Sequence, residues 1–501
     1  MACLIVCALV AALAVLVTAY IQWGYTYWKR RGLPHIPPTF PYGNYEPIFS
    51  RKQHFGEWAK SFYDQFKSRG VKHAGLYVLS KPIYLPIATD YVKNVLQNDF
   101  RHFVNRGTYY NEKDDPLSAH LFNLSGQKWR DLRTKLTPTF TSGKMKRMFN
   151  TLLDCTVPMR EAVASHCVDG TPVMIKEVIA RFTTDVIGSC AFGLECNSFK
   201  DDDAAFRHHG RALFNTQDKL NRAKRGLANI FPTLSRMLGV ALLPKESTQF
   251  FFNAVRDTIQ HREKNNVVRN DMLQILIELQ KSNKESGKPM LTMEQMAAEA
   301  FVFFIAGFET SSSVTTLCLY ELARNEDIQN KVREEIESTL RENDDEITYE
   351  AVMGMKYLDQ VVNETMRLYP SLTFLTRECV QDYPVPDTDV VIEKNTLVVI
   401  PSIALHKDPE FWDNPEAFDP EHFSAENTPK ITPFTYMPFG EGPRTCIGMR
   451  FGTMQVKVGL TTLLKDYAFS VCSKTVPPVL DKYLFISNTR DPVWLNVRKI
   501  T

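Results

Sequence analysis

Residues 438–448 read Pro438-Phe-Gly-Glu-Gly-Pro-Arg-Thr-Cys-Ile-Gly448, and this stretch decides how the chain is interpreted. Three glycines within nine residues predict a tight loop whose backbone can approach another group closely. A helical pattern of apolar residues begins directly after Cys446, at Met449, Phe451, Met454, Val458 and Leu460. The thiol of Cys446 is therefore expected at a helix N-terminus, where free backbone N–H groups and the helix dipole favour the thiolate.

A thiolate with backbone donors, and with no Cys or His ligand nearby in sequence, suits one axial bond to a metal macrocycle, whereas tetrahedral zinc needs further ligands. The alternatives are a buried structural cysteine and a nucleophile. The chain has ten cysteines but no CxxC pair, which argues against zinc ribbons, c-type haem attachment and a disulfide framework. We assign the other nine to packing or to the N-terminal apolar segment.

A second informative stretch is the helix predicted from Thr292, which forms a capping box with Gln295, to about Arg324. Its middle, residues 301–310, is apolar on all sides and should cross the core. Gly307, Glu309 and Thr310 interrupt this apolar run. They indicate either a packing notch with hydroxyls bonded back to the helix, or a helix opened against a ligand with an acid and a hydroxyl aimed at it.

With these residues in place, the chain resembles the cytochrome P-450 superfamily of haem-thiolate monooxygenases. Phe439-x-x-Gly-x-Arg444-x-Cys446-x-Gly448 is similar to the haem-binding signature of that family, and Ala306-Gly307-x-x-Thr310 to its oxygen-activating helix. Two further motifs, a Glu-x-x-Arg helix at 364–367 and a Trp-x-x-x-Arg haem contact at 129–133, occur in the family's order. The particular residues within these motifs resemble those of insect microsomal members of family six.

The resemblance implies a mainly α fold with small β-sheets and a bound haem b (iron protoporphyrin IX), with Cys446 as the axial iron ligand. It implies that Thr310 hydrogen-bonds the bound dioxygen and that Glu309 relays protons from water. The other residues implied to contact the haem are Trp129, Arg133, Arg377, Phe439, Arg444, Gly448, Ala306 and Gly307. Arg106 is a further candidate, for which a plain surface arginine is the alternative.

In the family, the buried Glu-x-x-Arg pair is joined by an arginine from a downstream Pro-Glu-Arg-Phe segment. Glu364 and Arg367 match that pair, but the downstream segment here reads Pro420-Glu-His422-Phe, so His422 replaces the arginine. A neutral histidine donates one hydrogen bond and cannot form a forked contact. We therefore predict that this network weakens when His422 is deprotonated. By spacing alone, a surface pair worth only tenths of a kcal/mol is the alternative.

The chain lacks GxGxxG in a βαβ context, a Walker loop, HExxH and GxSxG. A redox site without a dinucleotide fold implies that another protein delivers the electrons. The resemblance implies NADPH acting indirectly, through an NADPH-cytochrome P-450 reductase sometimes helped by cytochrome b5. Residues 128–147 hold seven Lys/Arg against one Asp, a local charge of +6, and could steer an acidic donor. A solvated helix face is the alternative.

Residues 1–28 carry no charged side chain, and 3–22 are almost wholly apolar, long enough to span a bilayer at about 20 residues. Aromatic residues at 23–28 suit the headgroup region, and Lys29, Arg30 and Arg31 predict that the chain downstream stays cytoplasmic. The absence of a basic n-region argues against a cleaved signal peptide. The sequons at Asn123 and Asn363 would then be silent. The resemblance implies the endoplasmic reticulum membrane.

The 501 residues carry a net charge of +2, and 44% of them are hydrophobic, which excludes disorder and a polyanion-binding role. We expect a membrane anchor at 1–28, a basic, Pro-rich connector at 29–44 and one catalytic domain at 45–501. Extended segments are expected near 74–87 and 389–400. The segment 227–243 is apolar and bounded by prolines, and is either a core helix pair or a second membrane contact.

The expected reaction inserts one oxygen atom of O2 into an apolar small molecule. Plant toxins, insecticides, and endogenous lipids or hormones all qualify as substrates, and nucleic acid does not. By position in the family, the candidate pocket residues are Tyr109, Tyr110, Leu121, Phe122, Phe301, Phe304, Leu372, Phe374 and Phe485. The alternatives are a thiolate-haem isomerase or dehydratase of oxygenated lipids, which tends to lose the acid–Thr pair, and a non-catalytic membrane haem or ligand carrier.

Overall fold

The computed structural model describes residues 1–501 except 202, 215–217, 286–290, 483, 485 and 501. The chain is mainly α-helical with small β-sheets, as the sequence predicts. Its contacts divide it into two compact units, each assembled from several segments. The first unit comprises residues 1–107, 372–413 and 432–445, and the second comprises 108–371, 414–431 and 446–501.

The first unit is built on a four-stranded sheet in the order β1-β2-β7-β4, in which only the β2–β7 pair is parallel. The predicted extended segments form β1 and β2, and β6 and β7. The strands are β1 (His73–Val78), β2 (Lys81–Pro86), β4 (Leu375–Glu378), β5 (Tyr383–Pro384), β6 (Val391–Ile392) and β7 (Leu397–Ile400). The helices are α1 (Ala2–Gly24), α2 (Tyr27–Arg30), α3 (Glu46–Phe49), α4 (Phe55–Lys67), α5 (Thr89–Lys93) and α19 (Ser402–His406). Short 3₁₀ or π turns lie at η1 (Asn94–Asn98), η2 (Phe100–His102) and η8 (Gly442–Arg444).

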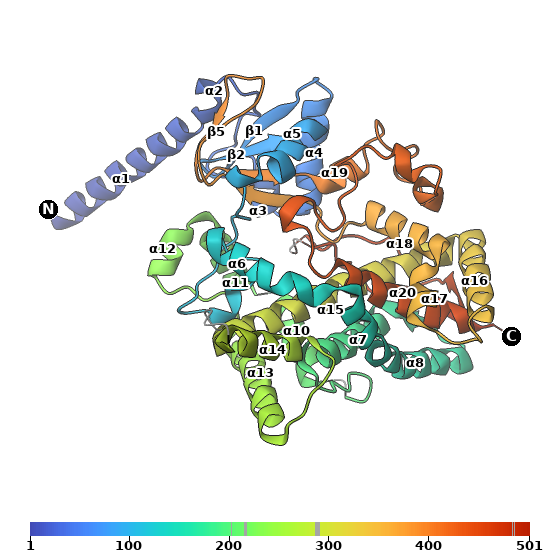
Figure 1. Ribbon diagram of the computed structural model, residues 1–501. Helices are drawn as coiled ribbons and strands as arrows, with labels where there is room; N and C mark the ends of the chain where they lie inside the picture. Colours follow the sequence, from blue (N-terminus) through green and yellow to red (C-terminus); the bar gives the residue numbers. More distant parts are fainter. Residues whose placement is uncertain (202, 215–217, 286–290, 483, 485, 501) are drawn as a thin grey trace. The chain divides into compact units, whose positions relative to one another are not determined.

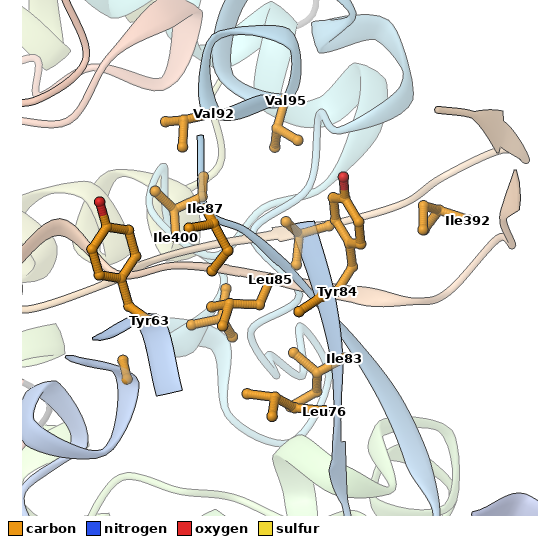
Figure 2. Close-up of a cluster of buried hydrophobic side chains, with 14 of the residues drawn as sticks. Tyr63, Leu76, Ile83, Tyr84, Leu85, Ile87, Val92, Val95, Ile392 and Ile400 are labelled. Carbon is orange, nitrogen blue, oxygen red and sulfur yellow. The ribbon is translucent and has the colours of Figure 1, made fainter. Parts of the chain in front are cut away.

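Apolar side chains from both halves of this sheet meet the helices in one core. Figure 2 shows Leu76, Ile83, Leu85 and Ile400 of the strands with Val92 and Val95 of the following helical turns, all buried. Burial does not alternate along these strands: residues 73–77 of β1 and 83–86 of β2 are all buried, so both faces of the pair are covered.

The second unit is helical, with one three-stranded sheet in the order β3-β9-β8. Its helices are α6 (Gly126–Leu136), α7 (Ser142–Asp154), α8 (Thr156–Asp169), α9 (Ile175–Ile187), α10 (Ala205–Phe214), α11 (Lys219–Ile230), α12 (Pro232–Met237), α13 (Lys245–Asn265), α14 (Met272–Glu285), α15 (Met293–Arg324), α16 (Glu326–Arg341), α17 (Tyr349–Gly354), α18 (Lys356–Leu368) and α20 (Met449–Asp466). Short turns are η3 (Pro116–Ser118), η4 (Thr137–Phe140), η5 (Gly188–Phe192), η6 (Pro420–Phe423) and η7 (Thr428–Lys430), and the strands are β3 (Val173–Met174), β8 (Tyr467–Val471) and β9 (Trp494–Lys499).

The helix α15 is the central element of this unit, and its capping box is confirmed. Thr292 Oγ1 accepts from Gln295 N–H at 3.2 Å, and Gln295 Oε1 accepts from Thr292 N–H at 3.0 Å. Helices α9, α13, α18 and α20 all pack on α15. This explains the apolar sequence on all its sides, since a helix that is hydrophobic all round must be buried.

Among the described residues, two helices are long and apolar enough to cross a membrane, α1 and α15. The apolar window of α15 is 78% buried, so α15 is a core helix, whereas that of α1 is fully exposed. In Figure 1, α1 extends away from its unit as a straight rod. The last residue of the aromatic run differs from expectation: Trp28 is completely buried, so it belongs to the core of the first unit and not to a headgroup belt.

Trp28 is fixed on β1 by two hydrogen bonds. Its Nε1–H donates to Leu76 O at 2.9 Å, and its backbone N–H donates to Tyr77 Oη at 3.0 Å. The ring lies against Gly75, where an added Cβ would come within 2.4 Å of Trp28 atoms. The connector continues along the same strand, because Gly75 N–H donates to Pro34 O at 2.8 Å.

The segment 227–243 is not a core helix pair. Its apolar side chains on α11, α12 and the next turn are largely exposed, with Met237 the most exposed at 80%. The others are Leu227, Phe231, Leu234 and Leu238.

Candidate functional site

Cys446 lies where the sequence places it, two residues before the N-cap Gly448 of α20, and its side chain is exposed. The loop before it, in the first unit, is held by its own backbone. Gly440 and Gly442 both have a φ of +72°, which favours glycine. At Gly442 an added Cβ would also meet Leu96 O at 1.9 Å, so this position requires the close approach that only glycine permits.

Arginines of the first unit gather beside that loop. Arg444 is buried and its Nε–H donates to Val104 O at 2.9 Å, while Arg106 Nη2–H donates to Arg444 O at 2.9 Å. Arg106 is thus tied to the loop. Phe439 is half-buried, and its backbone oxygen accepts from Thr445 Oγ1 at 3.4 Å.

Arg377 on β4 supplies the test of whether the first unit fits a haem. Its Nη1–H donates to Thr376 O, but its Nε is buried without a hydrogen-bond partner in the described part of the chain. Burial, and then the like charge of Arg106, lowers the pKa of Arg377 to about 9. A buried guanidinium short of an acceptor fits an anionic group such as a carboxylate, for which its fork geometry is suited.

In the second unit, Arg133 on α6 interacts electrostatically with Cys446. Burial lowers the pKa of Arg133, and the charge of Cys446 acts in the opposite direction. Trp129, one turn earlier, is buried. Gly448 faces Phe140 of η4, whose ring packs edge-on against Phe303 of α15 with centroids 5.4 Å apart.

Helix α15 has one open stretch. Ala306 is exposed in the middle of an otherwise buried helix, and Thr310, one turn later on the same face, is half-buried. Thr310 Oγ1 donates to Ala306 O, so the hydroxyl is oriented by its own helix. The two alternatives that the sequence left open are therefore both present here. The hydroxyl of Thr310 is bonded back to the helix, and the helix is exposed at this turn.

Gly307 faces a different neighbour. An added Cβ would come within 2.5 Å of Ile187 Cδ1 on α9, so this glycine is a packing notch between α15 and α9. The cost of a mid-helix glycine, about 1 kcal/mol relative to alanine, is thus offset by the close packing of two helices.

Glu309 is buried on α15 and accepts a hydrogen bond from Asn488 Nδ2 at Oε1. Burial raises the pKa of this carboxyl, while the positive charges of Lys176 and Arg207 lower it. Asn488 and Lys176 were not predicted from the sequence, because residues 179 and 133 positions from Glu309 carry no local signal of the contact.

The Glu364–Arg367 pair is completely buried, so the surface alternative is wrong. Arg367 donates to both carboxylate oxygens of Glu364 at 2.7 Å, and also to Pro415 O at 2.7 Å and Ala417 O at 2.9 Å. His422 Nδ1 lies 3.3 Å from each carboxylate oxygen, so it occupies the place predicted for it.

The candidate pocket residues fall in different environments. In the second unit, Tyr110 and Phe122 are half-buried and Leu121 is nearly buried, whereas Phe301 and Phe304 pack fully inside an aromatic cluster with Phe251. Tyr109 is buried with its hydroxyl donating to Val240 O at 2.6 Å. In the first unit, Leu372 and Phe374 are partly buried and pack on the core. Phe485 lies outside the described residues.

These features define a mostly helical protein with an exposed cysteine before a helix N-terminus, a buried arginine, Arg377, whose Nε has no acceptor in the described part of the chain, and an acid–threonine pair on a central helix. Comparison with known proteins agrees: the family model "Cytochrome P450" matches residues 38–495, and the chain belongs to the cytochrome P450 family. It is 44% identical to probable cytochrome P450 6a14 of Drosophila melanogaster, over 95% of this chain and 96% of that protein. It is 42% identical to cytochrome P450 6A1 of Musca domestica, over 97% and 96%.

Family membership makes the chain a monooxygenase with a haem cofactor. The residues described above fit that group in chemical type, because a thiolate donor and guanidinium partners for carboxylates are both present.

Proposed function

We propose that this chain is a membrane-anchored monooxygenase of the endoplasmic reticulum that oxidises apolar small molecules, with electrons from an NADPH-dependent reductase. In the proposal, Cys446 is the thiolate ligand of the haem iron, and Arg133, Arg377, Arg444 and Trp129 contact the haem. The haem supplies the iron at which dioxygen is activated. The observation that carries the proposal is the open turn of α15 at Ala306 and Thr310, beside the buried acid Glu309.

In this proposal Thr310 holds a proton at its Oγ1, ready to pass to the oxygen that leaves as water, and Glu309 replaces that proton from the solvent side. In the structure the single hydrogen of this hydroxyl is donated to Ala306 O, so that bond has to break before Oγ1 passes its proton on, while its lone pairs remain available to accept one. Thr310→Ala should therefore consume NADPH with little product and release peroxide. Thr315→Ala is a matched control, because Thr315 Oγ1 makes the same kind of bond to Ser311 O but is buried. Full coupling in Thr310→Ala would contradict the role.

The experiment that tests the reaction class is a carbon monoxide difference spectrum of the reduced protein, followed by turnover with NADPH and reductase. A thiolate-haem spectrum together with NADPH-dependent product supports the proposal. The same spectrum without turnover would favour the isomerase or the carrier.

Substrates are proposed to be xenobiotics such as plant toxins or insecticides, or endogenous lipids or hormones. Support comes from the apolar and aromatic character of the predicted pocket residues and from similarity to the insect proteins above. Screening the reconstituted protein for substrate-induced haem spectral shifts separates these groups.

The basic strip 128–147 is the proposed docking surface for the reductase. Three of its lysines have acidic partners in the second unit: Lys128 with Glu112, Lys144 with Glu278 at 3.7 Å, and Lys146 with Glu350. The charge free to steer a partner is therefore smaller than +6, and it is carried by other members of the strip, including the exposed Arg130 and Arg147.

Charge reversal at Arg130 and Arg147 should slow reduction more at low salt than at high salt, because exposed charges are screened. Reversal at Lys144 and Lys146 would also break the ion pairs with Glu278 and Glu350, so its effect on reduction would combine lost steering with lost structure. Lys200→Glu, at an exposed position, is a control whose charge change equals that of either single reversal. Stopped-flow reduction that is unchanged at low salt in the Arg130/Arg147 variant would remove this surface from the proposal.

The exposed apolar side chains of α11 and α12 support a second membrane contact by the second unit. A monomer seldom exposes several neighbouring large apolar residues without a partner surface. A tryptophan placed at Leu234 should be quenched by brominated lipid in vesicles, whereas one at Val168, which is even more exposed at the end of α8, should not. Equal quenching at both positions would argue against a specific contact.

A further inference from the structure

Two segments that the reaction so far does not use lie close to Glu309: one donates a hydrogen bond to it, and the other carries a cation that interacts with it electrostatically. Asn488, between β8 and β9, donates from Nδ2 to Glu309 Oε1. The next residue, Thr489, accepts at its backbone oxygen from Lys176 Nζ at 2.6 Å. Lys176 lies in the first turn of α9. One amide and one ammonium, joined through Thr489, thus lie beside the only buried carboxyl of the proposed proton relay.

The segment that carries Asn488 is itself firmly fixed. Ser487 N–H donates to Ser371 O at 2.9 Å, and Ser487 Oγ donates to Pro370 O at 2.5 Å. Asp481 N–H donates to Asn488 O at 2.8 Å. Because its backbone is held on both sides, the amide of Asn488 presents its donor to Glu309 in one direction.

The charges around Glu309 come from α9 and α10. Lys176 interacts electrostatically with Glu309, Asp481, Asp491 and Glu177, and no carboxylate in the described part of the chain lies within ion-pair distance of its Nζ. The charge of Arg207 on α10 also lowers the pKa of Glu309, but its guanidinium already forms an ion pair with Glu177. Of these two cations, Lys176 is therefore the one that forms no ion pair with another carboxylate in the described part of the chain.

A buried carboxyl with no partner loses both a fixed orientation and the ability to ionise, because burial disfavours its charged form. A hydrogen-bond donor and a nearby cation restore both. We propose that Asn488 and Lys176 are positioning residues for Glu309, holding its carboxyl in one orientation and keeping it able to give up and regain a proton during turnover. The inference rests on the relay role proposed above for Glu309.

The protonation state of Glu309 can be read directly by infrared spectroscopy. In the full-length holoprotein in lipid nanodiscs, the band of the protonated carboxyl is assigned by its loss in Glu309→Gln and then titrated. Asn488→Ala and Lys176→Met should each move its midpoint to higher pH by about one unit, tenfold in the ratio of protonated to ionised carboxyl, because each removes a group that favours the ionised form. The fraction of NADPH converted to product should fall, with its pH profile displaced in the same direction.

Conservative and matched variants separate positioning from general damage. Lys176→Arg keeps the charge and should restore the wild-type midpoint, and Asn488→Asp, of equal size, should displace it further upward by like-charge repulsion. Controls are Asn496→Ala, whose Nδ2 donates to Val471 O on the sheet β8–β9, and Lys200→Met at an exposed position. Both controls should leave the midpoint unchanged.

The two ideas fail in different ways. If Glu309→Gln couples NADPH to product as well as the wild type does, the relay role of Glu309 is wrong. If Glu309→Gln uncouples but Asn488→Ala, Asn488→Asp and Lys176→Met all keep the wild-type midpoint and pH profile, the positioning inference is overturned and the relay stands. A Lys176→Arg variant that behaves as Lys176→Met does would also overturn it.

Discussion

Replacing Arg367 by methionine should be among the most damaging single changes in the second unit. The substitution keeps most of the side-chain volume but removes the guanidinium that donates to Glu364, Pro415 O and Ala417 O. Glu364 would remain fully buried, with only Asp419 N–H at 2.9 Å and the longer contact to His422 as partners. The buried carboxylate would then be largely uncompensated.

The magnitude follows from burial. Breaking a buried ion pair by removing one partner costs about 3–5 kcal/mol, a large share of a typical total stability of about 5–15 kcal/mol. Lys430→Met is a control, because Lys430 pairs with Glu426 four residues earlier in the same unit and both side chains are exposed, at 63% and 84%. That variant should cost below about 1 kcal/mol.

Urea unfolding followed by circular dichroism compares the two variants with the wild type, and haem retention provides a second readout. A double variant, Glu364→Leu with Arg367→Met, should recover part of the lost stability, since no charge is left buried. Recovery is incomplete because Pro415 O and Ala417 O still lose their donor. If Arg367→Met and Lys430→Met destabilise equally, or if the double variant is no better than Arg367→Met, the argument from buried charge is refuted.

Three further predictions concern residues nearby in the same unit. Glu299 Oε1 accepts from Leu121 N–H at 2.9 Å, and burial raises the pKa of this carboxyl to about 8. The folded chain therefore keeps a proton that the unfolded chain releases above about pH 4.3, so the free energy of unfolding should fall as pH rises toward 8. Glu299→Gln should flatten that fall in thermal unfolding, and parallel curves would contradict it. Gly307→Ala should lower the free energy of unfolding by up to about 2 kcal/mol, because the added methyl group overpacks against Ile187 Cδ1 and the better helix propensity of alanine offsets only part of that cost. Ile187→Val removes the methyl group that is overpacked, so a double-mutant cycle should show a smaller cost for Gly307→Ala in that background. His422→Arg should make haem retention less dependent on pH between about pH 6 and 8; identical retention in variant and wild type would count against the weakened network.

The parts of the fold that sequence predicts well are those set by local rules. The capping box at Thr292 and the helix start after Cys446 depend on neighbouring residues only, and both are confirmed. The buried state of Glu364 and Arg367 could not be deduced from their spacing, because Arg324 and Glu321 show the same spacing with an exposed arginine. Family resemblance, not periodicity, distinguished the two pairs.

Contacts between distant segments escaped the sequence for a physical reason. Asn488 bonds Glu309, and Lys176 bonds the backbone of the neighbouring Thr489, through contacts that leave no period or motif in the chain. Trp28 was expected at the membrane surface because aromatic residues after a span usually lie there. Its partner Gly75, 47 residues later, makes the flat space into which the ring fits. Neither partner signals the other from its own position.

The seat of Trp28 on β1 determines where the chain can be shortened for work without a bilayer. A polypeptide beginning at Tyr25 keeps the indole over Gly75 and its donor to Leu76 O. Starting after Trp28 removes one of the largest fully buried side chains of the first unit and should cost about 3–5 kcal/mol, the range for deleting a large aromatic from a core. Removing residues 25–28 as well would thus leave a cavity beside β1. The yield of folded protein at 37 °C should be lower for the chain that starts at residue 29 than for the one that starts at Tyr25.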